Sequence, residues 1–223
     1  MPHPAAPATS LTPQQTQLRE FWNQRYVSAD YAYGTSPNDF LAAQQARLTA
    51  LPTAAAALCL GDGEGRNGVW LAGLGLTVTS VDLADAGLAK AQALATAHDV
   101  ALRLLQADVT QLDLGQARWG LIASVFMHLP AHDRRVLHRR CAAALQPGGL
   151  FIFEGYTPEQ IALGTGGPRD VNLLASLADL LDDFAGLPGL ELLHQHSGQR
   201  PVLEGRLHSG IGHTAQLLLR RSN

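Results

Sequence analysis

The stretch AAALCLGDGEGRN, residues 55–67, joins a short apolar run to a turn rich in glycine. The apolar run Ala55–Leu60 is typical of a buried parallel strand, and the residues from Arg66 to Leu74 favour a helix. Glycine permits positive φ and lets a ligand approach the backbone, while the free N–H groups at a helix start favour an anionic group such as a carboxylate. This strand–turn–helix unit predicts a ligand site at the carboxyl end of the first strand of an open α/β sheet.

The rest of the chain repeats the alternation of strand and helix. Further strands are expected at Thr77–Val81, Ala101–Gln106, Leu121–Phe126 and Leu150–Phe153, and further helices at Ala84–His98, Ala131–Leu145 and Val171–Phe184. A closing hairpin is expected from Leu190–His196, continued to Leu203, and from Thr214–Leu219, which makes seven strands. The pattern predicts a Rossmann-like, doubly wound, mostly parallel α/β sheet with helices on both faces.

An N-terminal segment precedes this pattern. Thr12-Pro13-Gln14-Gln15 offers a hydroxyl at the N-cap, proline at the first helical position and glutamine three residues after the cap. A second helix is expected at Asp39–Ala50. We therefore expect a disordered tail at residues 1–11 and one domain at 12–223, made of an N-terminal helical cap (12–52) and a Rossmann-like core (53–223).

The composition is that of a globular protein, with 46% hydrophobic residues, a formal net charge of -3 and a pI near 6.3. The lack of a basic field disfavours nucleic-acid binding, and no apolar run approaches the ~20 residues of a membrane span. The first ten residues lack the features of a signal peptide, so the cytoplasm is the expected compartment. The two cysteines make no metal pattern and no metal is expected, while the arginines within residues 134–140 favour a solvated helix face over an anion site.

Carboxylates follow the second and third predicted strands. Asp82 comes about 20 residues after the glycines, the spacing at which a carboxylate accepts hydrogen bonds from ribose hydroxyls; alternatively, it caps the helix that starts near Ala84. Asp108 and Val109 offer a carboxylate and a backbone N–H, which match the amino group and a ring nitrogen of adenine. These features predict a nucleoside cofactor. A nicotinamide dinucleotide fits less well, because Arg66 stands where its fingerprint needs a third glycine.

These motifs resemble those of the class I S-adenosylmethionine-dependent methyltransferases, with the glycine turn, Val81-Asp82, Ala107-Asp108-Val109 and Leu145-Gln146-Pro147-Gly148-Gly149 as the matching segments. The resemblance implies S-adenosylmethionine as cofactor and S-adenosylhomocysteine as product. The family has an acidic residue two positions before the first glycine, where this chain has Cys59, and Asp62 or Glu64 is the candidate replacement. The cofactor residues that we expect are Gly61, Asp62, Gly63, Gly65, Asn67, Asp82, Leu83, Asp108, Val109 and Phe126.

A closer resemblance is to the tellurite-resistance-type methyltransferases and their relatives. It rests on FWNQRY (residues 21–26), YGTSPNDFL (33–41), GEGRN (63–67) and LEGRLHSG (203–210). In that group the N-terminal segment folds over the cofactor, which makes Tyr26, Tyr33 and Asn38 candidates for a lid. Packing of a cap helix explains the aromatic residues equally well.

The acceptor chemistry is less defined. His128 and His208 are candidate general bases, with His213 near the latter, although transfer to a soft nucleophile needs no base. Tyr156 and Arg169 are candidates for the acceptor pocket, and Arg169 would suit an anion. The pI and the length favour a small-molecule acceptor over a macromolecule, and the oligomeric state is left open. Two other functions stay open: a nucleotide-dependent oxidoreductase on the same sheet, and a non-catalytic S-adenosylmethionine-binding protein.

Overall fold

Seven strands form one sheet in the computed structural model, which describes residues 11–222. Their order across the sheet is β3-β2-β1-β4-β5-β7-β6, and β7 runs antiparallel to both of its neighbours. The strands are β1 (Ala56–Leu60), β2 (Thr77–Asp82), β3 (Arg103–Gln106), β4 (Trp119–Val125), β5 (Leu145–Tyr156), β6 (Leu190–Leu203) and β7 (Ser209–Arg221). The predicted Rossmann-like, mostly parallel sheet with its closing hairpin is confirmed. The strand order reverses between β1 and β4, and sheets of this kind bind ligands at such a reversal.

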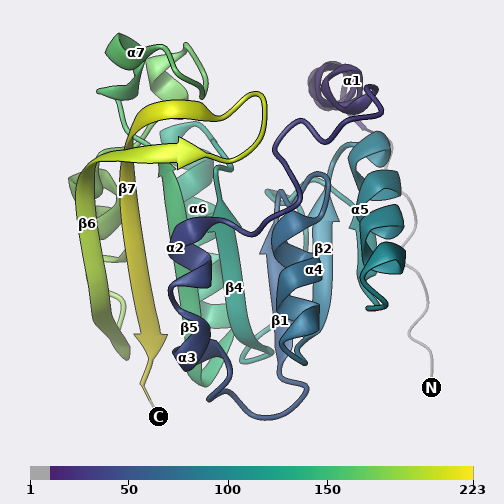
Figure 1. The fold of residues 1–223 in the computed structure, drawn as a ribbon. Helices are drawn as coiled ribbons and strands as arrows, with labels where there is room; N and C mark the ends of the chain where they lie inside the picture. The colour runs from purple at the N-terminus through teal and green to yellow at the C-terminus, as the bar shows by residue number, and fades with distance from the viewer. Residues whose placement is uncertain (1–10, 223) are drawn as a thin grey trace.

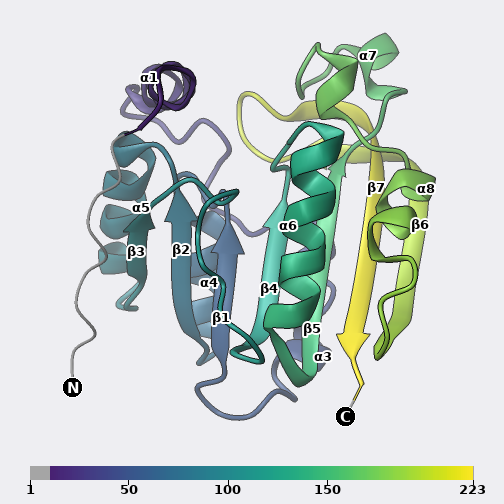
Figure 2. The ribbon, with the colours of Figure 1, turned by 180° about the vertical axis from the view of Figure 1, so that it is seen from behind.

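Helices cover both faces of the sheet. They are α1 (Pro13–Tyr26), α2 (Asp39–Ala42), α3 (Gln45–Leu48), α4 (Arg66–Gly73), α5 (Asp85–Ala97), α6 (Ala131–Ala144), α7 (Gln160–Leu163), the 3-10 turn η1 (Val171–Leu173) and α8 (Leu177–Phe184). Figure 1 shows α2, α3 and α4 in front of the sheet, Figure 2 shows α6 and α8 on the other face, and α1 lies across the carboxyl ends of the strands. None of the helices among residues 11–222 is long and apolar enough to cross a membrane.

The core has one apolar layer on each face of the sheet, and β1 contributes to both, as expected of a buried parallel strand. Leu58 and Leu60 belong to the cluster that contains residues of α6 and α8, whereas Ala57 and Cys59 belong to the cluster of α2, α3 and α4. Burial raises the pKa of the Cys59 thiol, so Cys59 acts as a small apolar residue between the sheet and α4.

The N-terminal helices begin as the sequence predicts but divide where it does not. Thr12 and Gln15 form the predicted capping box, with Gln15 N donating to Thr12 Oγ1 at 3.2 Å and Thr12 N donating to Gln15 Oε1 at 2.8 Å. The single helix expected at Asp39–Ala50 is instead α2 and α3. The expected helix is interrupted at Gln44. In a continuous α-helix Gln44 N would donate to Phe40 O, but it donates to Leu41 O instead, and the Gln44 side-chain amide donates to Phe40 O.

The single helix expected at Val171–Phe184 is wrong in its first half. Only the turn η1 forms there, and α8 starts afresh after Ser176. Ser176 Oγ accepts a hydrogen bond from Asp179 N at 3.2 Å, and Asp179 Oδ2 accepts one from Ser176 N at 2.9 Å. This capping box fixes a helix start at Ser176 and separates α8 from η1.

The expectation of a solvated face for the arginines of α6 is also wrong at Arg134. Its side chain is 7% exposed, and its Nε donates to Asp183 Oδ2 at 2.7 Å. His138 Nδ1 lies 2.8 Å from the same oxygen, and Arg135 remains half exposed. The arginine is buried because α8 packs on α6 and brings Asp183 against it. The tail expected at the N-terminus lies, up to residue 10, outside the described residues, and the division into cap and core stays a prediction.

Candidate functional site

A cavity of about 650 Å³ lies at the carboxyl ends of β1, β2 and β4, where the strand order reverses. Residues of α1 and the segments 166–170 and 207–208 complete its wall. The predicted site residues that line it are Tyr26, Tyr33, Gly61, Asp62, Gly63, Asn67, Asp82, Leu83, Asp108, Val109, Phe126, His128, Arg169 and His208. Those that lie outside its lining are Asn38, Gly65, Tyr156 and His213.

The glycine turn is packed tightly from two sides. Gly61, Gly63 and Gly65 have positive φ angles of 61°, 54° and 84°. A Cβ at Gly63 would lie 2.6 Å from Tyr26 Oη, and a Cβ at Gly65 would lie 2.5 Å from Ala91 Cβ. A side chain at either position would displace α1 or α5. Gly65 therefore shapes the turn without lining the cavity.

Asp82 braces this turn from the end of β2. Its Oδ2 accepts a hydrogen bond from Gly63 N at 2.8 Å, and its Oδ1 accepts one from Ala84 N at 2.8 Å. The alternative prediction, in which Asp82 holds the start of the next helix, is thus met in part, since Ala84 is the N-cap of α5. Burial raises the pKa of Asp82, whereas its backbone donors oppose that shift. Because each carboxylate oxygen can accept a second hydrogen bond, Asp82 can still bind a ligand in the cavity.

Asp108 is in contact with α1. Gln15 Nε2 donates to Asp108 Oδ2 at 2.5 Å. The other oxygen, Oδ1, accepts hydrogen bonds from Thr110 N at 2.8 Å and Thr110 Oγ1 at 2.7 Å. Asp108 Oδ2 therefore keeps one lone pair for a ligand in the cavity.

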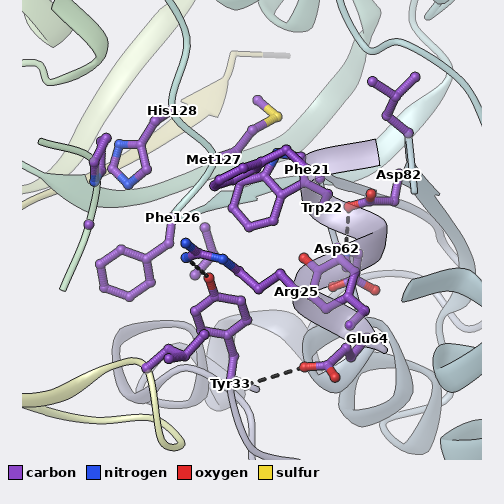
Figure 3. A pocket seen from close by; sticks show the side chains of 18 of the residues that line it. Phe21, Trp22, Arg25, Tyr33, Asp62, Glu64, Asp82, Phe126, Met127 and His128 are labelled. Atoms are coloured by element: carbon purple, nitrogen blue, oxygen red, sulfur yellow. Dashed lines mark hydrogen bonds between the residues drawn. The ribbon is translucent and has the colours of Figure 1, made fainter. Parts of the chain in front are cut away.

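Glu64 attaches the N-terminal segment to the glycine turn. It accepts hydrogen bonds from Ala32 N at 3.1 Å and Tyr33 N at 3.2 Å. Lys90 Nζ lies 2.7 Å from Glu64 Oε1 and balances its buried charge. Figure 3 shows Glu64 pointing toward Tyr33 at the edge of the cavity. Its carboxylate is engaged by these three donors.

Asp62 differs from Glu64 in that one of its oxygens is free. Oδ2 accepts hydrogen bonds from Ser80 Oγ at 2.6 Å and Gly68 N at 3.2 Å, whereas Oδ1 is buried without a hydrogen-bond partner. Burial raises the pKa of Asp62 to about 7 despite these donors. A void of about 10 Å³, room for roughly one water, lies beside it. The residues that line both this void and the main cavity are Gly61, Asp62, Asn67 and Val125.

The opposite end of the cavity is lined by Tyr33, Phe126, His128 and His208, against which Tyr156 packs, and we call these five residues the aromatic end. Figure 3 shows Tyr33, Phe126 and His128 in this region. The Phe126 ring centroid lies 4.6 Å from that of Tyr156 and 4.7 Å from that of His208. Tyr33 lies 4.6 Å from His208 on the other side. Burial lowers the pKa of His128 to about 4 and that of His208 to about 3. Both imidazoles are therefore neutral near pH 7, and Tyr156 packs against Phe126 outside the cavity lining.

Several side chains that line the cavity are absent from the predicted site, among them Phe21, Trp22, Arg25 and Met127. Arg25 Nη1 donates to Tyr33 Oη at 3.0 Å, and its guanidinium lies 4.9 Å from the Phe21 ring and 5.4 Å from the Trp22 ring. The first three belong to the FWNQRY segment, and Met127 precedes His128. The motif was therefore visible in the sequence, but which of its side chains face the cavity depends on how α1 is docked.

A buried ionic network joins the N-terminal segment to the C-terminal hairpin. Asn38 Nδ2 donates to Glu154 Oε2 at 2.5 Å and to Glu204 Oε1 at 2.9 Å. Arg200 Nη2 donates to the same two carboxylates at 2.7 and 2.8 Å, and Arg66 Nη2 donates to Glu204 Oε2 at 2.5 Å. The predicted lid residue Asn38 thus lies in this network and not in the cavity wall.

Comparison with known proteins identifies the domain. Residues 57–149 match the family described as a methyltransferase domain. A search of curated proteins finds no match. The structure is similar to a protein solved in a study of the conversion of a disulfide bond into a thioacetal group during echinomycin biosynthesis, with a TM-score of 0.73, 18% identity and coverage of 94% of this chain and 92% of that chain.

Two further solved structures share the fold. Magnesium protoporphyrin IX methyltransferase (ChlM) from Synechocystis PCC 6803 with bound SAH has a TM-score of 0.66 and 17% identity, with coverage of 93% of this chain and 99% of that chain. TehB from Haemophilus influenzae has a TM-score of 0.65 and 16% identity, with coverage of 92% of this chain and 67% of that chain. Residues 57–149 thus carry a methyltransferase domain, and they include the glycine turn, Asp82 and Asp108.

Proposed function

We propose that this enzyme transfers the methyl group of S-adenosylmethionine to a small-molecule acceptor. One observation carries the proposal: the glycine turn, Asp82 and Asp108 line the same cavity as His128 and His208. The cavity therefore offers polar groups for a nucleoside at one end and an aromatic end for an acceptor at the other. Its cover by α1 and the segment 166–170 suits a small acceptor better than a macromolecule.

In this proposal the polar end holds the cofactor. Asp82 accepts hydrogen bonds from the ribose hydroxyls through the lone pairs that Gly63 N and Ala84 N leave free. Asp108 and Val109 bind adenine, with Asp108 Oδ2 accepting through the lone pair that Gln15 leaves free. The remaining contacts of the cofactor come from Gly61, Gly63, Asn67, Leu83 and Phe126.

We assign the ammonium group of the cofactor to Asp62. The supporting observation is its buried Oδ1, which has no partner and borders a void that shares its lining with the main cavity. A buried unpaired carboxylate oxygen is costly, and a cation beside it removes that cost. Cys59, with its neutral thiol, cannot supply this charge, and the Glu64 carboxylate is engaged by other donors.

The cofactor supplies an activated methyl group, and the chain supplies alignment. Phe126, Tyr33 and His208 form a wall against which the acceptor is held, while α1 covers the cavity and excludes water. Holding two reactants in line in this way contributes roughly 7–11 kcal/mol to catalysis.

Membership of the tellurite-resistance-type group is part of this proposal. It is supported by the FWNQRY segment, which forms the end of α1 over the cavity, and by the likeness to TehB from Haemophilus influenzae. Tellurite is therefore one acceptor to include in a turnover assay.

The test is calorimetric titration with S-adenosylhomocysteine and, separately, with a nicotinamide dinucleotide. We expect the wild type to bind only the former and Asp82→Ala to bind it at least tenfold more weakly. Asp182→Ala, which removes an exposed carboxylate on α8, is the matched control and should bind as the wild type does. Thermal unfolding of each variant checks that it is folded. Failure of the wild type to bind S-adenosylhomocysteine would refute the proposal.

A further inference from the structure

The aromatic end contains three buried polar atoms without hydrogen-bond partners. They are His128 Nε2, His208 Nδ1 and Tyr156 Oη. The ring of Tyr156 lies 5.9 Å from that of His128 and 5.3 Å from that of His208, so the three atoms belong to one cluster. Because buried polar groups in folded proteins almost always have partners, such a cluster beside a cavity points to a ligand.

The two imidazoles of this cluster are poor proton acceptors. The pKa of His128 is about 4 because the ring is buried, and that of His208 is about 3 because burial is reinforced by Arg66. Moving a proton from a phenol, with a pKa of about 10, to His128 is therefore unfavourable by about a millionfold. An acceptor that must lose a proton is poorly served here.

The charge near the aromatic end is positive. Within residues 11–222 no carboxylate forms an ion pair with the Arg25 guanidinium, whose one side-chain hydrogen bond goes to Tyr33 Oη. Figure 3 shows Arg25 extending across the cavity toward Tyr33 and Phe126. Of the carboxylates nearby, Glu64 is paired with Lys90 and Glu204 with Arg66, and Asp170 in the cavity wall accepts hydrogen bonds from Asn172. An unpaired guanidinium in this position suits an anion.

We propose that the methyl acceptor is an organic anion with a flat apolar body, a carboxylate or a thiolate, bound by Arg25 against Phe126. This inference rests on the proposed function. The acceptor attacks with a lone pair of its anionic atom, the new bond forms to the methyl carbon, and the carbon–sulfur bond breaks with its electron pair passing to sulfur. The negative charge of the acceptor cancels the positive charge of the sulfonium, so no proton is removed. His128, His208 and Tyr156 then act as hydrogen-bonding groups and not as bases.

Four probes with a phenyl body test this charge preference at pH 7.5: benzoate, thiophenolate, phenol and benzylamine. Each is titrated into the protein saturated with S-adenosylhomocysteine. We expect benzoate or thiophenolate to bind at least tenfold more tightly than phenol and benzylamine. With S-adenosylmethionine, turnover of benzoate or of thiophenolate then distinguishes the carboxylate from the thiolate.

The matched variants are Arg25→Gln and Arg135→Gln, both of which remove a guanidinium from an exposed position of a helix. Arg25→Gln should lose at least tenfold in affinity for the anionic probe, and Arg135→Gln should lose none. Tighter binding or faster turnover of phenol or benzylamine, or an undiminished preference in Arg25→Gln, would overturn the inference. If S-adenosylhomocysteine itself does not bind, the proposed function fails instead, so the two failures are distinguishable.

Discussion

Replacement of Asp62 by asparagine should remove the pH dependence of stability that the Asp62 carboxyl imposes. The folded protein raises the pKa of this carboxyl from 3.8 to about 7 by burial, with Asp82 adding to the shift and Arg66, Ser80 and Gly68 opposing it. A raised carboxyl pKa means that the ionised form is disfavoured in the folded state. The contribution of Asp62 to the free energy of unfolding is therefore most favourable below pH 3.8 and declines as the pH rises to about 7. A difference of about three pH units corresponds to roughly 4 kcal/mol.

Asparagine imitates the neutral carboxyl, because its amide oxygen can keep both hydrogen bonds that Oδ2 accepts. Urea unfolding of both proteins between pH 5 and pH 8.5, without cofactor, measures the effect. We expect Asp62→Asn to gain on the wild type as the pH rises from 5 and to level off above pH 7, with a total change of about 3 kcal/mol over this range. A difference that is constant across this range would refute the view that Asp62 is the group responsible.

Cofactor binding provides the second part of this prediction. An ammonium group beside Oδ1 lowers the pKa of Asp62, so that binding S-adenosylhomocysteine at pH 7 should release about half a proton. Calorimetry in two buffers with different ionisation enthalpies measures that release. Asp62→Asn should release none from this site and should bind more weakly, whereas 5′-methylthioadenosine, which has no ammonium group, should bind both proteins alike. Equal loss of affinity for both ligands would contradict the assignment.

Three further substitutions test other contacts. Gly68→Ala should cost about 1–3 kcal/mol in urea unfolding, because its Cβ would lie 2.3 Å from Ser80 Oγ, whereas Gly73→Ala in the same helix meets nothing within 4 Å and should gain up to about 1 kcal/mol. Asp183→Asn should cost about 3–5 kcal/mol at pH 7, because it breaks a buried ion pair, and its exposed neighbour Asp182→Asn at most about 1 kcal/mol. The pKa of Asp183 is lowered by His138 and Arg134 against the effect of burial, so its contribution should disappear as the pH falls below the unfolded value near 4. Gln15→Ala should leave S-adenosylhomocysteine binding within about twofold in calorimetry, because Asp108 Oδ2 already keeps a lone pair for adenine beside Gln15; a tightening of about tenfold or more would contradict that assignment.

The sheet could be predicted because each strand is a short apolar or β-branched run that can be identified within its own segment of sequence. The apolar run of β1 and the turn that follows it place Asp82 and Asp108 at the same edge once the strands are parallel. The breaks between helices were harder to predict. Ser176 and Asp179 form a capping pattern, but the apolar residues on both sides of it also fit one continuous helix. The predicted helix began too early because the apolar pattern before Ser176 and the capping residues at Ser176 and Asp179 indicate different helix starts.

The site residues that escaped prediction depend on contacts between distant segments. An arginine on a helix, such as Arg25, is usually solvated, and only the docking of α1 turns it toward the cavity. Asn38 is conspicuous in its motif, but its partner Glu154 lies 116 positions away. The free oxygen of Asp62 depends on Ser80 and Gly68 holding the other one. No pattern of residue types within one segment specifies these contacts between distant segments.

The ionic network also determines when a newly made chain can acquire its site. Glu154, at the end of β5, has Arg200 and Gln216 among its partners, both on the final hairpin. A ribosome-bound chain that has emerged only as far as β5 holds a carboxylate whose cationic partner is still in the tunnel. Burying such a charge alone costs several kcal/mol, so the burial of Glu154 becomes favourable only once β6 and β7 supply Arg200 and Gln216. The network that joins the N-terminal segment to the sheet is therefore completed only after the hairpin of β6 and β7 has folded.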